Sequence, residues 1–383
     1  MSALAAGHLG TDFASGSLPA LLPFLRDRFS LSYTLAAGLM LASAASSSLV
    51  QPLFGLWSDR RGASWLLPGG VALAGVGIAL AAAASSYWIV LVFVVISGLG
   101  VAAYHPEGSK FAAYASGRKR ASGMSAFAIG GNVGFALGPI VATPLVLWLG
   151  LRGGLLLALP PLAIAAALFA LLPFLRTFVP ERSVERGSVG KDQPGALTIL
   201  LAVIGFRSLA WWGLLTFVPL WEVSLGHSKS YGNHLLSLML LVGGIGTIVV
   251  GPLADRVGRR PVLVASLLAA GPLILVFVVV GGVLGAVALA LAGISVVGTF
   301  GLTMVMAQEY LPRRIGMASG LSIGFSIGLG GIAALGLGAL ADAVDLRAAL
   351  YVCAAAPLAG LALTLVLPST RTRQKLEPEI AVP

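Results

Sequence analysis

The stretch from Tyr104 to Lys110 holds His105, Glu107 and Lys110 at the end of an apolar run that begins at Trp88. Ionisable groups inside a membrane are costly, so they are usually functional. His105 titrates near neutral pH and could relay protons. Pro106 removes a backbone donor and can free helix carbonyls there for water or a ligand. The pattern points to proton transfer, or to the binding of a charged ligand, within a membrane.

Composition predicts a polytopic α-helical membrane protein. Of the 383 residues, 58% are hydrophobic and only 10% are charged, whereas soluble domains have about 25% charged residues. A helical span needs roughly 20 apolar residues. We predict an all-α fold of twelve transmembrane helices in two pseudo-symmetric six-helix bundles. The predicted spans are residues 3–25, 33–56, 65–84, 88–113, 122–149, 153–175, 197–221, 232–254, 261–281, 284–307, 316–341 and 347–367.

The net charge of +10 follows membrane topology rather than a nucleic-acid partner. Of the 24 Lys and Arg residues, seventeen lie in one set of alternate connections and in the tail, and five lie in the opposite set. This asymmetry predicts a multi-pass protein of the inner or plasma membrane, with both termini in the cytoplasm. The remaining two, Lys110 and Arg207, fall inside predicted spans.

The two halves of the sequence resemble each other, which indicates an internal duplication. Gly55–Gly62 recurs as Gly251–Gly258, at an offset of 196 positions, and the longest polar break divides the chain between them. We predict an N-terminal bundle over 1–175, a cytoplasmic linker over 176–196, and a C-terminal bundle with a short tail over 197–383. Duplicated halves of this kind place a substrate near the bilayer midplane, at their interface.

Glycines repeat every four residues on the fifth and eleventh spans, and they predict close backbone contact. The residues are Gly130, Gly134 and Gly138, and then Gly316, Gly320, Gly324 and Gly328. Sliding contacts would make Gly134, Gly138, Gly320 and Gly324 gating residues, whereas static packing is the alternative.

The segment Gly251–Arg260 resembles the loop signature of the major facilitator superfamily, and Gly55–Gly62 is its degenerate copy. Further stretches resemble fosmidomycin-resistance-like facilitators: His8–Asp12 with Leu18–Pro23, Gln51-Pro52, Tyr104–Glu107, Gly130–Pro139, and Arg207-Ser208. The resemblance implies export of small molecules or drugs, driven by inward proton flow. The fifth span carries only part of the antiporter motif, because Ala142 and Thr143 stand where paired glycines are expected.

The loop signature also has a physical interpretation. Helix N-termini carry partial positive charge that attracts carboxylates, so Asp59 and Asp255 could latch the two halves at the cytoplasmic side. Arg60, Arg256 and Arg259 would compete as partners of these carboxylates. The alternative is that all of these charges only fix topology.

Asp12 and Arg207 are counterparts near the middles of spans one and seven, at an offset of 195 positions. A carboxylate whose protonation depends on a nearby Arg would couple proton and substrate fluxes, and a permanent salt bridge is the alternative. Proton coupling is assigned to Asp12, Glu107, His105 and His8, the last of which lies one turn before Asp12. The histidines could instead be packing residues, and Glu107 could simply pair with Lys110.

Substrate binding is assigned to polar and aromatic residues expected around the cavity: Arg207, Lys110, Gln51, Asn132, Trp211, Trp212 and Tyr104. The tryptophans could instead be ordinary packing residues. Arg207 and Lys110 favour an anionic substrate, whereas Asp12 and Glu107 could receive a cation.

Together with these residues, the resemblance implies a secondary active transporter, a proton-coupled antiporter that exports a small anionic or drug-like molecule by alternating access. Uptake by symport, or transport of a metabolite or lipid, is the alternative. The sequence contains no metalloprotease, nucleophile-elbow or phosphate-loop motif, so no enzyme is expected. The single Cys353 and the absence of metal-ligand spacing predict no cofactor and no metal. The expected partners are a small substrate, protons and the bilayer, and we expect a monomer.

Overall fold

A computed structural model describes residues 1–116, 120–178, 191–313 and 315–368, except for the side chains of 59–61, 120–122, 315–316 and 319. The described chain is helical, which confirms the all-α prediction. Eleven of its helical runs are long and apolar enough to cross a membrane. Together with α1 (Ser2–Phe29), they account for the twelve predicted spans.

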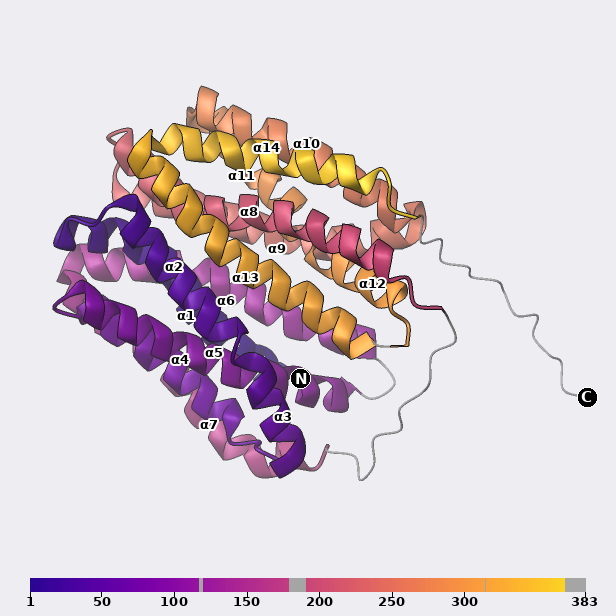
Figure 1. Ribbon diagram of the computed structural model, residues 1–383. Coiled ribbons are helices and arrows are strands. Elements are labelled where there is room, and N and C mark those ends of the chain that lie inside the picture. Colours follow the sequence, from indigo (N-terminus) through magenta and orange to yellow (C-terminus); the bar gives the residue numbers. More distant parts are fainter. Residues whose placement is uncertain (117–119, 179–190, 314, 369–383) are drawn as a thin grey trace, which may run out of the picture.

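The helices follow the chain in the predicted order (Figure 1). In the N-terminal half they are α2 (Tyr33–Ser48), α3 (Gln51–Arg61), α4 (Leu66–Ala83), α5 (Tyr87–Ser116), α6 (Arg120–Leu149), the 3-10 helix η2 (Leu151–Ala158) and α7 (Leu159–Arg176). In the C-terminal half they are α8 (Pro194–Ser224), α9 (Lys229–Val257), α10 (Arg259–Val280), α11 (Gly282–Val297), α12 (Phe300–Tyr310), α13 (Ile315–Ala343) and α14 (Leu346–Thr364). The predicted boundaries of the linker include residues 179–190, which lie outside the described chain, so the division into domains stays a prediction.

Two of the spans are interrupted. The second consists of α2 and α3, which meet at Leu49 and Val50, and the tenth consists of α11 and α12, which meet at Gly298 and Thr299. Broken helices in a membrane are tolerated where they line a cavity or pack inside protein. Both interruptions therefore mark places where a cavity is expected.

Helix α1 is the least apolar of the twelve spans, because it carries His8, Thr11 and Asp12 among glycines and serines. It is absent from the eleven runs that are apolar enough to cross a membrane on composition. It contacts α4, α5, α6 and α7 of its own half, and α8 and α9 of the other half. Surrounding helices thus shield this polar helix from lipid.

The glycines of α6 let it approach α1 backbone to backbone. A Cβ atom at Gly134 would lie 2.2 Å from the carbonyl oxygen of Leu9, and one at Gly130 would lie 2.1 Å from that of Ala5. A Cβ atom at Gly138 would lie 2.4 Å from the carbonyl carbon of Gly16. The predicted glycine face of the fifth span therefore packs within the N-terminal half.

The two halves meet mainly through α2 against α13 and through α6 against α9. Figure 1 shows the indigo and magenta helices of one half beside the orange and yellow helices of the other. We call the end at which α1 begins the terminal end, and the opposite end the distal end. A clasp of polar contacts joins the halves in the distal part of the molecule.

The distal clasp has Asp342 of α13 at its centre. Its carboxylate accepts hydrogen bonds from the backbone N–H groups of Tyr33 and Thr34, each at 2.8 Å, and from the Thr34 hydroxyl at 2.6 Å. These groups form the N-terminus of α2, whose partial positive charge attracts a carboxylate. Lys229 adds an ion pair with Asp27 across the halves. Asn233, deeper in the interface, donates to the Ala20 carbonyl at 3.0 Å.

Toward the terminal end, α13 faces open space. A Cβ atom at Gly320, Gly324 or Gly328 would meet no atom within 4 Å. Among the described residues, Gly320, Gly324 and Gly328 therefore lack the close contact expected along this glycine face, in contrast to the glycines of α6. The halves are joined distally and lie apart where α13 approaches the terminal end.

The glycine contacts predict unequal effects of one matched substitution. Gly134→Ala should destabilise the protein by about 1–3 kcal/mol, because the methyl group would overlap the Leu9 carbonyl. Gly324→Ala is the control and should be neutral or slightly stabilising, because alanine favours helix and the space there is open. Thermal unfolding of both purified variants in detergent measures the difference. Equal effects of the two changes would contradict the packing of α6 on α1.

The clasp predicts that Asp342→Asn loosens the distal end, because an amide cannot accept all three hydrogen bonds and carries no charge. Asp345→Asn is the matched control, since Asp345 caps only its own helix α14, through Ala348 N at 2.7 Å. Spin labels at Ser30 and Val344, with Cys353 replaced by Ala, would report the distance between the halves. We expect a longer distance in Asp342→Asn alone, and unchanged distances in both variants would contradict the clasp.

Candidate functional site

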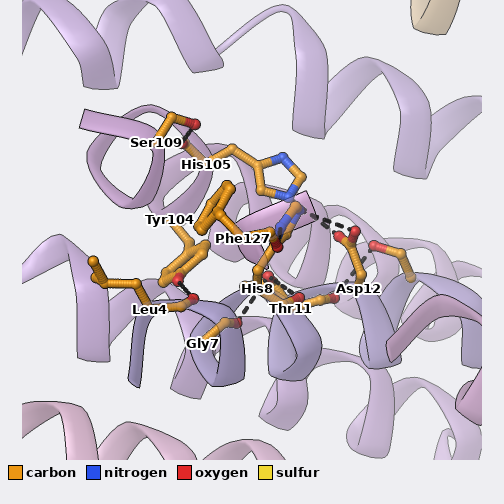
Figure 2. A network of polar contacts seen from close by, with 10 residues as sticks. Leu4, Gly7, His8, Thr11, Asp12, Tyr104, His105, Ser109 and Phe127 are labelled. Carbon is orange, nitrogen blue, oxygen red and sulfur yellow. Dashed lines mark hydrogen bonds and ion pairs between the residues drawn. The ribbon is translucent and has the colours of Figure 1, made fainter. Parts of the chain in front are cut away.

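Three ionisable side chains converge near the middle of the N-terminal half. Helix α1 contributes His8 and Asp12, which lie one turn apart, and α5 contributes His105 (Figure 2). His8 Nε2 lies 3.2 Å from Asp12 Oδ2, and His105 Nε2 lies 3.1 Å from Asp12 Oδ1. We call these residues the His-Asp-His cluster. Three of the four predicted proton-coupling residues are thus brought together.

The hydrogen bonds of His8 determine where its protons lie. Nδ1 is 2.8 Å from the backbone carbonyl oxygen of Phe127. Because a carbonyl oxygen only accepts, Nδ1 must carry a hydrogen. In neutral His8, Nε2 would then be a bare acceptor facing the Asp12 carboxylate, and two acceptors at 3.2 Å repel. The geometry therefore requires one additional proton, either on His8 Nε2 or on Asp12.

His105 needs no such extra proton, since its neutral form can donate from Nε2 to Asp12 Oδ1. The side chains of His105, Asp12 and His8 are 25%, 15% and 15% exposed. Partial exposure gives protons a route to the cluster. One proton beyond those of two neutral imidazoles and a carboxylate thus satisfies the contacts of the whole cluster.

The cluster corrects one expectation from the sequence, which showed no metal-ligand spacing. Its two imidazole nitrogens and one carboxylate oxygen all lie within 4.8 Å of one another. Zinc accepts such a donor set, so these three residues could hold a metal ion. The observed separations of 3.1 and 3.2 Å are hydrogen-bond distances, which protons satisfy without a metal.

Packing around His8 holds its ring in place. Phe127 stacks on the imidazole at a centroid distance of 4.2 Å. Tyr104, a predicted substrate residue, is fully buried, and its hydroxyl donates to the Leu4 carbonyl. It is not on the cavity wall. Tyr104 instead joins α5 to α1, which helps to place His105 beside Asp12.

A cavity of about 210 Å³ lies between the two halves, against the His-Asp-His cluster. Its polar wall is contributed by the N-terminal half and consists of Asp12, Ser15, Ser43, Ser47, Gln51 and His105. Its apolar wall comes from both halves and consists of Met40, Val101, Phe135, Trp211, Trp212, Leu215, Phe300 and Ile327. Gln51, Trp211 and Trp212 therefore lie where a substrate contact was expected.

Arg207 and Asp12 do not pair in this structure, so the alternative of a permanent salt bridge between them is not seen, and Asp12 has the two histidines rather than Arg207 beside it. Arg207 is 1% exposed, and its Nη1 donates to Thr303 Oγ1 at 3.1 Å and to Thr299 Oγ1 at 3.4 Å. Its guanidinium lies over the ring of Phe300. The two counterparts thus have separate surroundings, Asp12 on the cavity wall and Arg207 behind it.

Glu107 and Lys110 lie in a different pocket, nearer the terminal end. This pocket of about 240 Å³ is also lined by Ser58, Ser64 and Arg176. Lys110 Nζ pairs with Glu107 Oε2 at 2.8 Å, and both side chains hydrogen bond to Ser58. The simple pairing is therefore present. In this structure neither residue shares the cavity of the His-Asp-His cluster.

The other predicted site residues lie outside the central cavity. Asn132 donates to Thr247 Oγ1 at 3.3 Å across the halves and borders an apolar groove between α6 and α9. Arg259 forms ion pairs with Asp255, at 3.7 Å, and with Glu309, all within the C-terminal half. Arg256 is exposed. The side chains of Asp59 and Arg60 lie outside the described residues.

Sequence reasoning missed several residues that shape the site. Phe300 and the Thr299–Thr303 pair were not considered, although the Gly298-Thr299 break marks them. Ser43 and Ser47 are signalled by the serine-rich end of the second span. The Phe127 carbonyl, which fixes His8, is a backbone group and leaves no signal in the sequence.

The cluster has a close neighbour that carries no charge. A Cβ atom at Gly131 would lie 2.6 Å from Asp12 Oδ2 and from His8 Nε2. Gly131→Ala should therefore distort the cluster at a cost of about 1–3 kcal/mol while leaving every ionisable group present. We expect a lower unfolding temperature and impaired proton movement in proteoliposomes. The control is Gly336→Ala, at which a methyl group meets no atom within 4 Å. Equal behaviour of the two variants would contradict the close packing over the cluster.

Comparisons with known proteins agree with the helical fold. The profile described as Major Facilitator Superfamily matches residues 4–322 and 200–382. An uncharacterized MFS-type transporter of Bacillus subtilis is 34% identical, with 94% of this chain and 91% of that protein covered. The Fosmidomycin resistance protein of Escherichia coli is 31% identical, with 97% and 93% covered.

The fold also matches a solved structure, a bacterial homolog of the human lysosomal transporter Spinster in an inward-facing and occupied conformation. The TM-score is 0.78 at 15% identity, with 96% of each chain covered. The chain is a membrane transporter that belongs to the Major Facilitator Superfamily, within its fosmidomycin-resistance-like group.

Proposed function

We propose that this transporter is a proton-coupled antiporter that exports a small organic molecule by alternating access. The observation that supports the proposal is the His-Asp-His cluster, whose geometry calls for one additional proton and which borders a cavity of about 210 Å³ between the halves. A substrate and a proton that share one cavity can influence each other's binding. Such mutual influence is the coupling free energy that an antiporter requires.

The physical basis of the exchange is the charge of the cluster. Without its additional proton, the cluster leaves the His8 lone pair against a carboxylate, which is unfavourable in a site of low dielectric. Uptake of one proton relieves the repulsion, and its loss restores it. A substrate that changes the hydration or the field in the cavity will therefore shift proton occupancy, and the proton will shift substrate affinity equally.

The terminal end is proposed to face the cytoplasm. The support is the excess of Lys and Arg in the connections at that end, in keeping with the positive-inside rule. The distal clasp then closes the outer side, and the structure corresponds to an inward-open state. The likeness to an inward-facing solved structure is consistent with this orientation.

Glu107 is proposed to act as the inner proton exit. It is 1% exposed and lies two residues beyond His105 on α5, nearer the terminal end. A proton that leaves the His-Asp-His cluster toward the cytoplasm would pass close to it. Lys110, which pairs with Glu107, is then proposed to stabilise its ionised form rather than to bind the substrate in the cavity.

Closure of the inner side is assigned to the loop signature and the glycine faces. Asp59 and Asp255, with Arg60, Arg256 and Arg259, are proposed to rearrange when the halves meet at the terminal end. Open space at Gly320 and Gly324 leaves room for that approach. Gly134 and Gly138 are proposed to keep the N-terminal half rigid as it moves.

The substrate is proposed to lie between Gln51 on one wall and Trp211 and Trp212 on the other. An aromatic and apolar wall suits a ligand with a compact organic body. The export direction draws support from the 31% identical relative of Escherichia coli, whose name denotes fosmidomycin resistance. Fosmidomycin is therefore the first probe for transport.

Asp12→Asn should abolish proton-driven export while leaving exchange of the probe intact, because the amide keeps the shape of the cluster but cannot carry its proton. Proteoliposomes loaded with fosmidomycin report both activities, efflux under a pH gradient and counterflow without one. Glu107→Gln should slow gradient-driven efflux, since the proton loses its exit. Full coupled efflux in Asp12→Asn would contradict the proposal, and influx that follows the proton gradient would identify a symporter instead.

A further inference from the structure

Arg207 is a buried cation whose counter-charge is missing among the described residues. It is 1% exposed, it donates hydrogen bonds to two threonine hydroxyls, and its Nε has no hydrogen-bond partner among the described residues. No carboxylate in the described part of the chain forms an ion pair with it. A buried charge without a partner is strongly unfavourable, so a ligand that supplies the negative charge would relieve the site.

The side chain of Phe300 contacts Arg207 and also lines the central cavity. The ring of Phe300 lies against the guanidinium, with its centroid 3.9 Å from Cζ. The same ring lines the cavity and contacts Trp211 at a centroid distance of 6.1 Å. The cation–π contact partly compensates the charge. Phe300 thus forms a cover between the cavity and the guanidinium.

Phe300 lies at a break in a helix. It is the first residue of α12, directly after Gly298 and Thr299, which separate α11 from α12. At the next residue, a Cβ atom added to Gly301 would meet no described atom within 4 Å. Broken helices beside a cavity are characteristic of transporter binding sites. Phe300 thus lies at an irregular point of the backbone, beside the cavity and with open space at its neighbour.

The duplication gives an independent indication. Arg207 follows Asp12 by 195 positions, and Phe300 follows His105 by the same 195 positions. The contact between Asp12 and His105 in one half is thus repeated as the contact between Arg207 and Phe300 in the other. The Asp12–His105 pair belongs to the cluster that is proposed to exchange a proton, whereas the Arg207–Phe300 pair carries a permanent positive charge. One half is thus suited to binding a proton and the other to binding an anion.

We propose that Arg207 binds the acidic group of the substrate, a small organic anion with a carboxylate or phosphonate, and that Phe300 covers Arg207 until the anion displaces the ring. This inference rests on the proposed transport function and names its substrate class. A guanidinium binds either acid through two parallel charge-assisted hydrogen bonds. The body of the anion then lies against Trp211 and Trp212. Phe300 changes how tightly the anion binds, whereas Arg207 sets the preference for an anion over a neutral ligand.

Ligand binding to the purified transporter at neutral pH, with no proton gradient, tests the proposal. The probes are benzoate, phenylphosphonate and fosmidomycin, with benzamide as the neutral counterpart of benzoate. Tryptophan fluorescence reports binding, because Trp211 and Trp212 line the cavity. The variants are Arg207→Gln, Arg207→Lys and Phe300→Ala. Arg347→Gln is the control, since Arg347 lies over Trp221 and away from the cavity lining.

We expect at least one acid to bind, with benzoate or phenylphosphonate favoured over benzamide by about tenfold or more. Arg207→Gln should remove that preference, Arg207→Lys should retain part of it, and Arg347→Gln should leave it unchanged. Phe300→Ala should tighten binding of the acids by about tenfold, because the covered fraction of sites is lost. This variant tests the cover even if Arg207→Gln fails to fold, which size-exclusion chromatography would reveal.

Two results would overturn the inference. One is a wild-type protein that binds none of the acids or binds benzamide as well as benzoate. The other is Phe300→Ala with unchanged or weaker acid binding. Because these assays use no gradient, the prediction that Asp12→Asn loses proton coupling can be confirmed or contradicted independently of them. Failure of the anion site is thus distinguishable from failure of the proton-coupled function.

Discussion

The arrangement depends on one hydrogen bond, from His8 Nδ1 to the backbone carbonyl of Phe127. This bond fixes the tautomer of His8, so that an additional proton is needed between His8 Nε2 and the Asp12 carboxylate. Leaving out that proton is unfavourable because the cluster lies among membrane helices, where water screens charges poorly. Because the Phe127 carbonyl fixes His8 beside Asp12, the charge of this pair changes with the proton concentration.

Close helix packing makes this bond possible. The Phe127 carbonyl belongs to α6 and His8 belongs to α1, and the two helices approach because glycines on α6 leave no side chain between them. Tyr104 ties α5 to the same end of α1, which brings His105 to the other carboxylate oxygen. Small residues thus set the position of the ionisable ones, and the clasp at Asp342 holds the second half against this unit at the distal end.

Sequence reasoning predicted the class of fold because hydropathy and loop charge reflect the membrane directly. It also found Asp12, His8 and His105, because ionisable groups in apolar runs are conspicuous. It could not show that Arg207 and Asp12 stand apart, since counterpart positions in a duplication need not touch. Nor could it separate Glu107 from His105, because two residues along a helix change the direction of a side chain. The roles of Asp342 and Phe300 depend on contacts between segments that are distant in the chain, and the sequence alone does not show such contacts.

The central claim is that the substrate and the proton bind in one cavity and that each changes the binding of the other. The most direct test counts the protons taken up or released when a saturating ligand is added to purified transporter in weakly buffered solution, with a pH-sensitive dye as the readout and fosmidomycin as the ligand. The account predicts that ligand binding changes the number of bound protons by up to about one per ligand in the wild type, and does not change it in Asp12→Asn. Ligand binding without any proton exchange in the wild type, or an equal exchange in both proteins, would contradict it.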